Sequence, residues 1–134
     1  MDAALVRLVW QRAQGCCEYC QLSQEWDDRP FEIDHVMSKK HQGPTVAGNL
    51  ALSCFRCNSS KGVCISGREL TTRKLTPLFN PRRQKWPTHF RWQGAYLFGR
   101  TPVGRVTVAL LQINDDYRVE LRAGLIDEGV FPPA

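Results

Sequence analysis

The sequence predicts an α+β fold, in which a small β-rich core lies between helical segments, and three observations lead to this prediction. Apolar residues recur at helical spacing in residues 3–14 and in residues 101–128, toward the two ends of the chain. Two short segments that favour β-strands, residues 31–36 and 49–53, lie between these helices. Two C-x-x-C pairs enclose both β segments, which indicates a core tied together by its cysteines.

The first helix is expected over residues 3–14, because Leu5, Val9 and neighbouring apolar residues fall on one face. Gly15 is typical of a helix stop signal. Residues 23–30 are polar and acidic, so we expect a loop there.

The β-rich core follows this loop. Residues 31–36 alternate between apolar and polar side chains, which predicts a strand, and residues 49–53 predict a second one. The polar segment 38–48 contains glycine and proline and is expected to be a loop. After the second C-x-x-C turn, we expect residues 58–62 to open a helix.

The second half of the chain begins with a segment, residues 66–74, that we expect to be irregular. Residues 75–79 look like a strand. Residues 89–93 and 95–98 flank Gly94, which predicts a tight hairpin.

Two helices are expected to end the fold. Thr101 followed by Pro102 is typical of a helix N-cap with proline at the first position, so a helix is predicted over residues 101–113. A second helix is predicted over residues 115–128, with acidic residues at its start. Its apolar residues are Val119, Leu121, Leu125 and Ile126.

The length of 134 residues suits one compact domain, or a small module with an appendage. We expect residues 1–66 to form the core with its N-terminal helix. Residues 67–134 are expected to be a C-terminal extension of strands and two helices, packed on that core.

The chain is basic, with a formal net charge of +5 and a pI of about 9.1. This favours a polyanionic partner, although a ribosomal protein or a merely basic enzyme would have the same charge. No stretch approaches the ~20 apolar residues that a membrane helix needs. The N-terminus also lacks the apolar region of a signal peptide, so we expect a cytoplasmic protein.

The two C-x-x-C pairs, Cys17/Cys20 and Cys54/Cys57, predict a metal site. In a reducing compartment four thiolates suit a tetrahedral Zn²⁺, and a closed four-cysteine site is structural rather than catalytic. The alternatives are free cysteines that share this spacing by coincidence, or redox chemistry, for which two matched pairs are not needed. Cys16 and Cys64 are left over and are interpreted as small buried apolar residues.

Five short runs occur in order from residue 17 to residue 62, and together they resemble the HNH endonuclease family: C-E-Y-C, E-I-D-H, H-Q-G-P-T, N-L-A-L-S-C and F-R-C-N-S-S-K-G. The resemblance implies a ββα-metal (His-Me finger) core, in which a β-hairpin packs on a helix with one divalent metal ion between them. The later stretch P-L-F-N-P-R-R-Q-K-W-P-T-H-F-R-W is similar, more loosely, to the downstream part of one bacterial HNH subgroup.

The resemblance also implies roles for four residues. His35 matches the general base that takes a proton from water, and Asn49 matches the residue whose side chain would accept from the other ring nitrogen of His35. Asp34 and Asn58 match the ligands of a catalytic Mg²⁺ or Mn²⁺. Asn58 replaces the last histidine of many members, so this is an H-N-N variant, for which we expect Mg²⁺ or Mn²⁺ to be preferred over Ni²⁺ or Zn²⁺. Adjacent strand residues point to opposite faces, so Asp34 and His35 can share a site only at a strand end or a bulge.

The predicted activity is hydrolysis of phosphodiester bonds in DNA, and RNA is a second polyanion that the sequence allows. Six basic residues are candidate nucleic-acid contacts: Lys61, Arg56, Arg82, Arg83, Lys85 and His41. The alternative functions are a zinc-stapled nucleic-acid-binding module without catalysis, and a protein-interaction module with the helices of residues 101–128 as its docking surface. Substrate form and oligomeric state are open.

Overall fold

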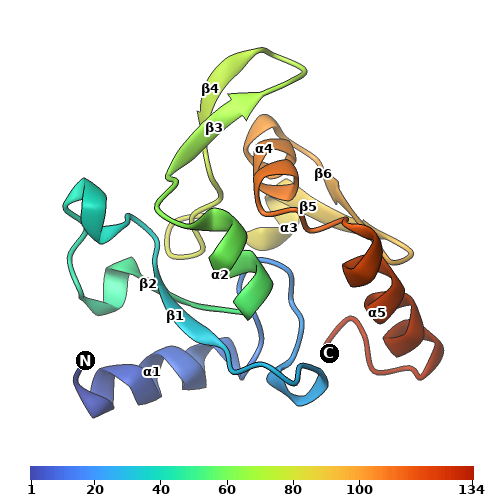
Figure 1. Ribbon diagram of the computed structural model, residues 1–134, viewed down its shortest axis with the longest axis horizontal. Coiled ribbons are helices and arrows are strands. Elements are labelled where there is room, and N and C mark those ends of the chain that lie inside the picture. The colour runs from blue at the N-terminus through green and yellow to red at the C-terminus, as the bar shows by residue number, and fades with distance from the viewer.

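A computed structural model describes residues 1–134 as a small mixed α/β fold with three separate antiparallel strand pairs (Figure 1). The helices are α1 (Ala3–Ala13), α2 (Phe55–Lys61), α3 (Trp86–His89), α4 (Pro102–Leu110) and α5 (Asp116–Asp127). The strands are β1 (Glu32–His35), β2 (Leu50–Ser53), β3 (Ser66–Glu69), β4 (Lys74–Pro77), β5 (Phe90–Gln93) and β6 (Tyr96–Gly99). The predicted fold class is confirmed.

The core of the fold is the β1–β2 hairpin, with Ile33 opposite Leu52 and Asp34 opposite Ala51. Every residue of β2 is buried, because α1 packs against this strand, while α2 packs against β1. Figure 1 shows α1 along one side of the hairpin and α2 along the other. This is the ββα arrangement that the resemblance implies.

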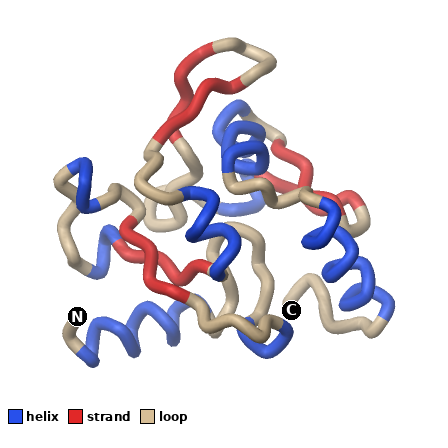
Figure 2. Tube along the Cα trace, in the orientation of Figure 1, coloured by secondary structure: helices blue, strands red, loops and turns tan.

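The connection between β1 and β2 is long and irregular, as Figure 2 shows. It contains only the short 3-10 turns η2 (Lys39–His41) and η3 (Ala47–Asn49), and a third turn, η1 (Gln24–Trp26), lies before β1. The predicted loops at residues 23–30 and 38–48 are therefore confirmed, apart from these short turns.

Helix α2 begins earlier than the sequence suggested. We expected residues 58–62 to open this helix, but it starts at Phe55 and Gly62 ends it, with φ at +52°. The Cys54 sulfur accepts from the Cys57 amide at 3.4 Å as the N-cap contact. The second C-x-x-C turn is thus itself the first turn of the helix.

The prediction that residues 66–74 are irregular is wrong. They form β3 and the turn of a hairpin with β4, and β4 is shorter than the predicted strand of residues 75–79. Both Glu69 carboxylate oxygens accept backbone amides of the turn, from Thr71 at 2.8 Å and Thr72 at 3.0 Å. This side-chain turn, rather than an alternating apolar pattern, closes the hairpin.

The β5–β6 hairpin and helices α4 and α5 agree with the sequence, whereas the short helix α3 was not expected and includes His89, which was placed in a strand. Gly94 turns the β5–β6 hairpin at a φ of +58°, where glycine carries no steric cost. The Thr101 hydroxyl accepts from the Gly104 amide at 3.1 Å as the predicted N-cap of α4. The buried face of α5 differs, because Arg118, Arg122 and Leu125 are buried there, while the other predicted apolar residues are only half-buried.

The two halves of the chain share one hydrophobic core. Two indole N–H groups join them: Trp86 donates to the Tyr19 carbonyl at 2.9 Å and Trp92 donates to Gln21 Oε1 at 2.8 Å. No helix of the structure has both the length and the apolar character to cross a bilayer.

Candidate active site and metal centre

Three of the four predicted catalytic residues line one small cavity. Asp34 and His35 come from the end of β1, and Asn58 comes from the middle of α2, which packs against that strand. The cavity has a volume of about 250 Å³, and its remaining lining residues are Ile33, Ser38, Lys39 and Gly62.

Asp34 and His35 share this cavity because β1 ends at His35. The register with β2 runs unbroken to His35 opposite Leu50, so there is no bulge. Directly after the strand, the chain turns away into the irregular connection. Within a strand Asp34 and His35 would point to opposite faces, but at the strand end both can line one cavity.

Asp34 is buried, with 5% of its surface exposed, and both carboxylate oxygens are engaged. Its Oδ2 accepts from the Tyr19 hydroxyl at 2.7 Å, and its Oδ1 accepts from Lys61 Nζ at 3.1 Å. Burial raises the pKa of Asp34, and the Lys61 ammonium and Tyr19 hydroxyl oppose that rise. Each carboxylate oxygen keeps a second lone pair and so retains acceptor capacity.

Lys61 is fully buried, with only 1% of its side chain exposed. Besides Asp34, its ammonium donates to the His35 carbonyl at 3.1 Å and to the Val36 carbonyl at 3.2 Å. All three ammonium protons are therefore used inside the protein. The prediction that Lys61 contacts a nucleic-acid phosphate is corrected here: it holds Asp34 and the end of β1.

The His35 ring lies at the edge of the cavity, where its Nε2 is 2.8 Å from the Thr45 hydroxyl. Burial lowers the pKa of His35, and the nearby Lys39 and Lys61 act in the same direction, while Asp34 raises it. The net effect is a lowered pKa, which favours the neutral imidazole at neutral pH. A neutral ring is the form that accepts a proton.

The Asn49 side chain forms no hydrogen bond with His35, so the predicted hydrogen bond between them is wrong. Its Oδ1 accepts from the Met37 amide at 2.9 Å, and its Nδ2 donates to the carbonyls of Met37 at 3.0 Å and Pro44 at 2.9 Å. Asn49 thus closes the segment that follows His35. It acts on the backbone beside the site rather than on the imidazole.

The Asn58 side chain is oriented by Glu32, two residues before Asp34 on the same strand face. Its Nδ2 donates to Glu32 Oε2, which leaves the amide oxygen Oδ1 free of hydrogen bonds. Asp34 and Asn58 together offer oxygen donors, which suit a hard cation such as Mg²⁺ that keeps several waters. The residues present therefore fit the implied divalent ion.

The four predicted zinc ligands form a second, separate cluster. Cys17, Cys20, Cys54 and Cys57 are all buried, and their sulfurs lie within 4.8 Å of one another. The Cys20 and Cys54 sulfurs are 3.7 Å apart, close to the ~3.8 Å that a tetrahedral Zn²⁺ with 2.3 Å bonds requires. Cys16 and Cys64 lie outside this cluster and are half-buried. The donor set fits a closed structural metal site.

Sequence reasoning missed the partner of this cluster, Arg118 of α5. Its Nη2 donates to Cys57 Sγ at 2.8 Å, and its Nη1 donates to the Leu111 carbonyl at 2.7 Å. Burial lowers the pKa of Arg118, but the cysteine thiolates outweigh this and raise it above its ordinary value. Two arginines four residues apart on an otherwise buried helix face, Arg118 and Arg122, are the signal that could have revealed it.

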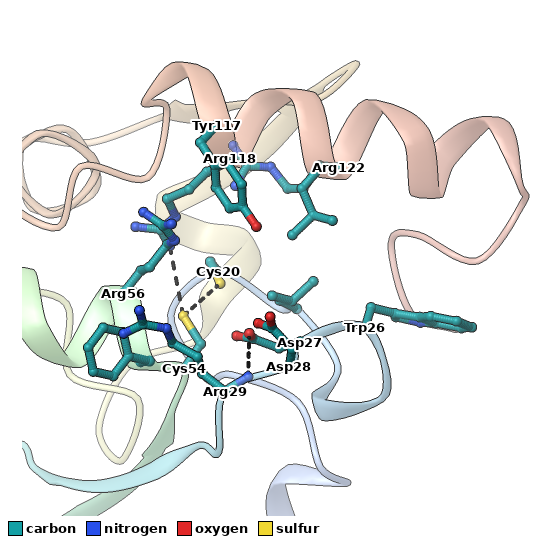
Figure 3. Close-up of a pocket in the computed structure, with 13 residues that line it drawn as sticks. Cys20, Trp26, Asp27, Asp28, Arg29, Cys54, Arg56, Tyr117, Arg118 and Arg122 are labelled. Carbon is teal, nitrogen blue, oxygen red and sulfur yellow. Dashed lines mark hydrogen bonds between the residues drawn. The ribbon is translucent and has the colours of Figure 1, made fainter.

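The largest cavity, about 320 Å³, lies beside the cysteine cluster rather than at Asp34 and His35. Figure 3 shows Tyr117 and Arg118 of α5 above it and the loop residues Asp27 and Asp28 below it. None of the predicted catalytic residues lines this cavity.

The other candidate nucleic-acid contacts differ in their surroundings. Arg82 forms an ion pair with Glu18 and is 14% exposed, so it is already neutralised. Arg56 lies over the Tyr117 ring, 4.1 Å from its centroid, beside the large cavity. Arg83, Lys85 and His41 are exposed.

A β-hairpin and a helix bring together Asp34, His35 and Asn58, with four cysteines at their base. Residues 17–63 match the family described as HNH endonuclease, which confirms the resemblance seen in the sequence over this region.

One curated protein is similar to this chain. The chain is 29% identical over 100 residues to the Septu protein PtuB of Bacillus thuringiensis, a match that covers 73% of this chain and 36% of that protein. The chain thus spans about a third of the length of this relative. No solved structure matches the chain.

Proposed function

We propose that this protein is a metal-dependent endonuclease that hydrolyses phosphodiester bonds in DNA. The observation that carries the proposal is the convergence of Asp34, His35 and Asn58 on one polar cavity within the matched HNH region. The basic composition, with a net charge of +5, is compatible with a polyanionic substrate.

His35 is the proposed general base. Its lowered pKa keeps the imidazole neutral near pH 7, so the ring can accept a proton from the water that attacks the phosphorus. The contact between His35 Nε2 and the Thr45 hydroxyl orients the ring. Thr45 lies in the segment closed by Asn49, which gives Asn49 its positioning role.

Asp34 and Asn58 are the proposed ligands of Mg²⁺ or Mn²⁺, which would stabilise negative charge on the phosphorane and on the leaving oxygen. Lys61 holds Asp34 by an ion pair, and Glu32 holds the Asn58 amide so that its oxygen remains available. Because an amide oxygen is a harder ligand than imidazole, we expect cleavage with Mg²⁺ or Mn²⁺ to exceed cleavage with Ni²⁺ or Zn²⁺.

The four-cysteine cluster is proposed to hold Zn²⁺ as a scaffold. Its sulfurs are buried and none of them lines the cavity that contains His35. A closed shell of four thiolates leaves no position for a substrate or a water.

A plasmid nicking assay tests this function. Wild-type protein with Mg²⁺ or Mn²⁺ should nick supercoiled DNA, and His35→Ala should be slower by about 100-fold or more, the usual contribution of a general base. His89→Gln is the matched control, because His89 is bonded to Thr101, outside the cavity, and should retain activity. If the wild type cuts no faster than His35→Ala across metals and substrates, the nuclease proposal fails.

A further inference from the structure

The β3–β4 hairpin is the most prominent projection of the molecule. Figure 1 shows it extending away from the body, beyond α2 and α4. One of its faces packs on α4, where a Cβ added at Gly67 would lie 3.1 Å from Val106 Cγ2. Arg68 and Leu75 on the opposite face and residues 70–74 at the tip are exposed, and four residues per strand correspond to a reach of roughly 13 Å.

The free surface of this hairpin is cationic. Arg68, Arg73 and Lys74 are exposed, and Glu69 is the only acidic residue between Ser66 and Pro77. Glu69 is buried, with 3% of its side chain exposed, and it is neutralised by Arg105 of α4 at 3.2 Å. The hydrogen bonds from Arg105 and from the turn amides lower the pKa of Glu69 to about 2. The Glu69 carboxylate is therefore paired inside the protein, and the three exposed cations form no ion pair with it.

The base of this hairpin is close in the chain to the candidate active site. Gly62 lines the cavity of His35, and β3 begins four residues later at Ser66. A groove of about 240 Å³ is lined by residues that adjoin both regions in the chain. Its lining includes Val36 and Lys61 from the side of the active site, Ile65 and Pro77 from the base of the hairpin, and the exposed Arg83.

We propose that the β3–β4 hairpin is an arm that binds the phosphate backbone of nucleic acid beside the scissile bond. Only the location of the scissile bond rests on the proposed nuclease function. Phosphate contacts by Arg68, Arg73 and Lys74 position a duplex without reading its sequence. The groove lined by Arg83 gives the strand a path from the arm to the cavity of His35.

The hairpin also carries two very exposed apolar residues, Leu70 at 77% and Leu75 at 78%. Such side chains would also suit a protein partner. The charge of the hairpin favours nucleic acid instead, because three exposed cations without a free acid attract a polyanion and disfavour a basic partner. Removing the three charges alone should weaken DNA binding if the hairpin binds nucleic acid, and should leave DNA binding unchanged if the leucines bind a protein.

The test compares two triple variants that lose the same charge. Arg68→Gln/Arg73→Gln/Lys74→Gln removes the cations of the arm, and Arg7→Gln/Arg91→Gln/Arg100→Gln removes three exposed cations from α1 and from the β5–β6 hairpin and its exit. Both are made in a His35→Ala background, and the affinity for a labelled 20-bp duplex is measured by anisotropy over a range of NaCl concentrations, without added divalent metal.

Each phosphate contact contributes about 0.9 to the slope of log K against log salt, so the arm variant should lose on the order of 2–3 from that slope. Its affinity at low salt should fall at least tenfold below that of the control. Equal affinity and equal slope for the two variants would overturn the proposal. The exposed leucines would then favour a protein partner for the hairpin.

Nicking by the same triple variants with His35 intact separates this inference from the nuclease proposal. The arm variant should have a raised KM and an unchanged rate at saturating DNA. If the wild type does not nick DNA but binds it, and the arm variant loses this binding, the proposal of a DNA-binding arm is supported and the nuclease proposal is refuted. Nicking with the same KM in both variants refutes the arm alone.

Discussion

The Arg118 guanidinium lies 2.8 Å from Cys57 Sγ and joins the last helix of the chain to the cysteine cluster. Four thiolates on one Zn²⁺ carry a net charge of −2, and a buried cation that donates to a sulfur offsets part of it. The same guanidinium donates to the carbonyl of Leu111, just after α4. One side chain thus connects the cluster, the end of α4 and α5.

Arg118→Met should destabilise the protein by about 3–5 kcal/mol, because it leaves buried sulfur charge without its partner. Zinc should also be released faster to a chromophoric chelator. Arg56→Met is the matched control, since Arg56 is exposed and should change either quantity little. Zinc release at the wild-type rate in Arg118→Met would show that the arginine packs beside the cluster without stabilising it.

Metal content tests the cluster itself. The protein should bind one zinc per chain, and Cys54→Ser or prolonged chelation should abolish cooperative unfolding, because structural zinc contributes directly to folding free energy. Cys16→Ser and Cys64→Ser remove the two cysteines outside the cluster and should keep the full zinc content. Loss of zinc from either of those two variants would contradict the assigned ligand set.

Asn49 should affect the catalytic rate without binding the metal. Asn49→Ala removes three hydrogen bonds that close the segment after His35, at a cost of about 1 kcal/mol each. We expect a lower kcat with an unchanged apparent affinity for Mn²⁺, and Asn49→Asp should rescue only the bond from the Met37 amide. A weakened Mn²⁺ affinity in Asn49→Ala would instead assign the residue to the metal site.

Features that depend on neighbours in the chain could be predicted from the sequence. The Thr101 cap and the Gly94 turn are local chemistry, and the C-x-x-C pairs bring their own ligands together. The contacts missing from the prediction join residues distant in the chain, as between Arg118 and Cys57, 61 positions apart. The burial of Lys61 was missed for the same reason, since a lysine one turn beyond Asn58 looks exposed until β1 is packed against α2.

The sequence did not predict the β3–β4 hairpin, because packing rather than strand propensity forms it. The contribution of Glu69 to this hairpin can be tested by its dependence on pH. A carboxyl group whose pKa in the folded protein is lowered to about 2, from about 4.3 in the unfolded chain, stabilises the fold above pH 4.3 and loses this effect as the pH falls toward 2. Glu69→Gln should therefore lower the Tm at pH 7, and the difference from wild type should shrink between pH 4.5 and pH 2. Glu120→Gln, an exposed acid on α5, is the control and should change the Tm little at any pH. A Tm difference for Glu69→Gln that persists unchanged to pH 2 would mean that the amide fails for steric reasons and that the ionised carboxylate is not what closes the turn.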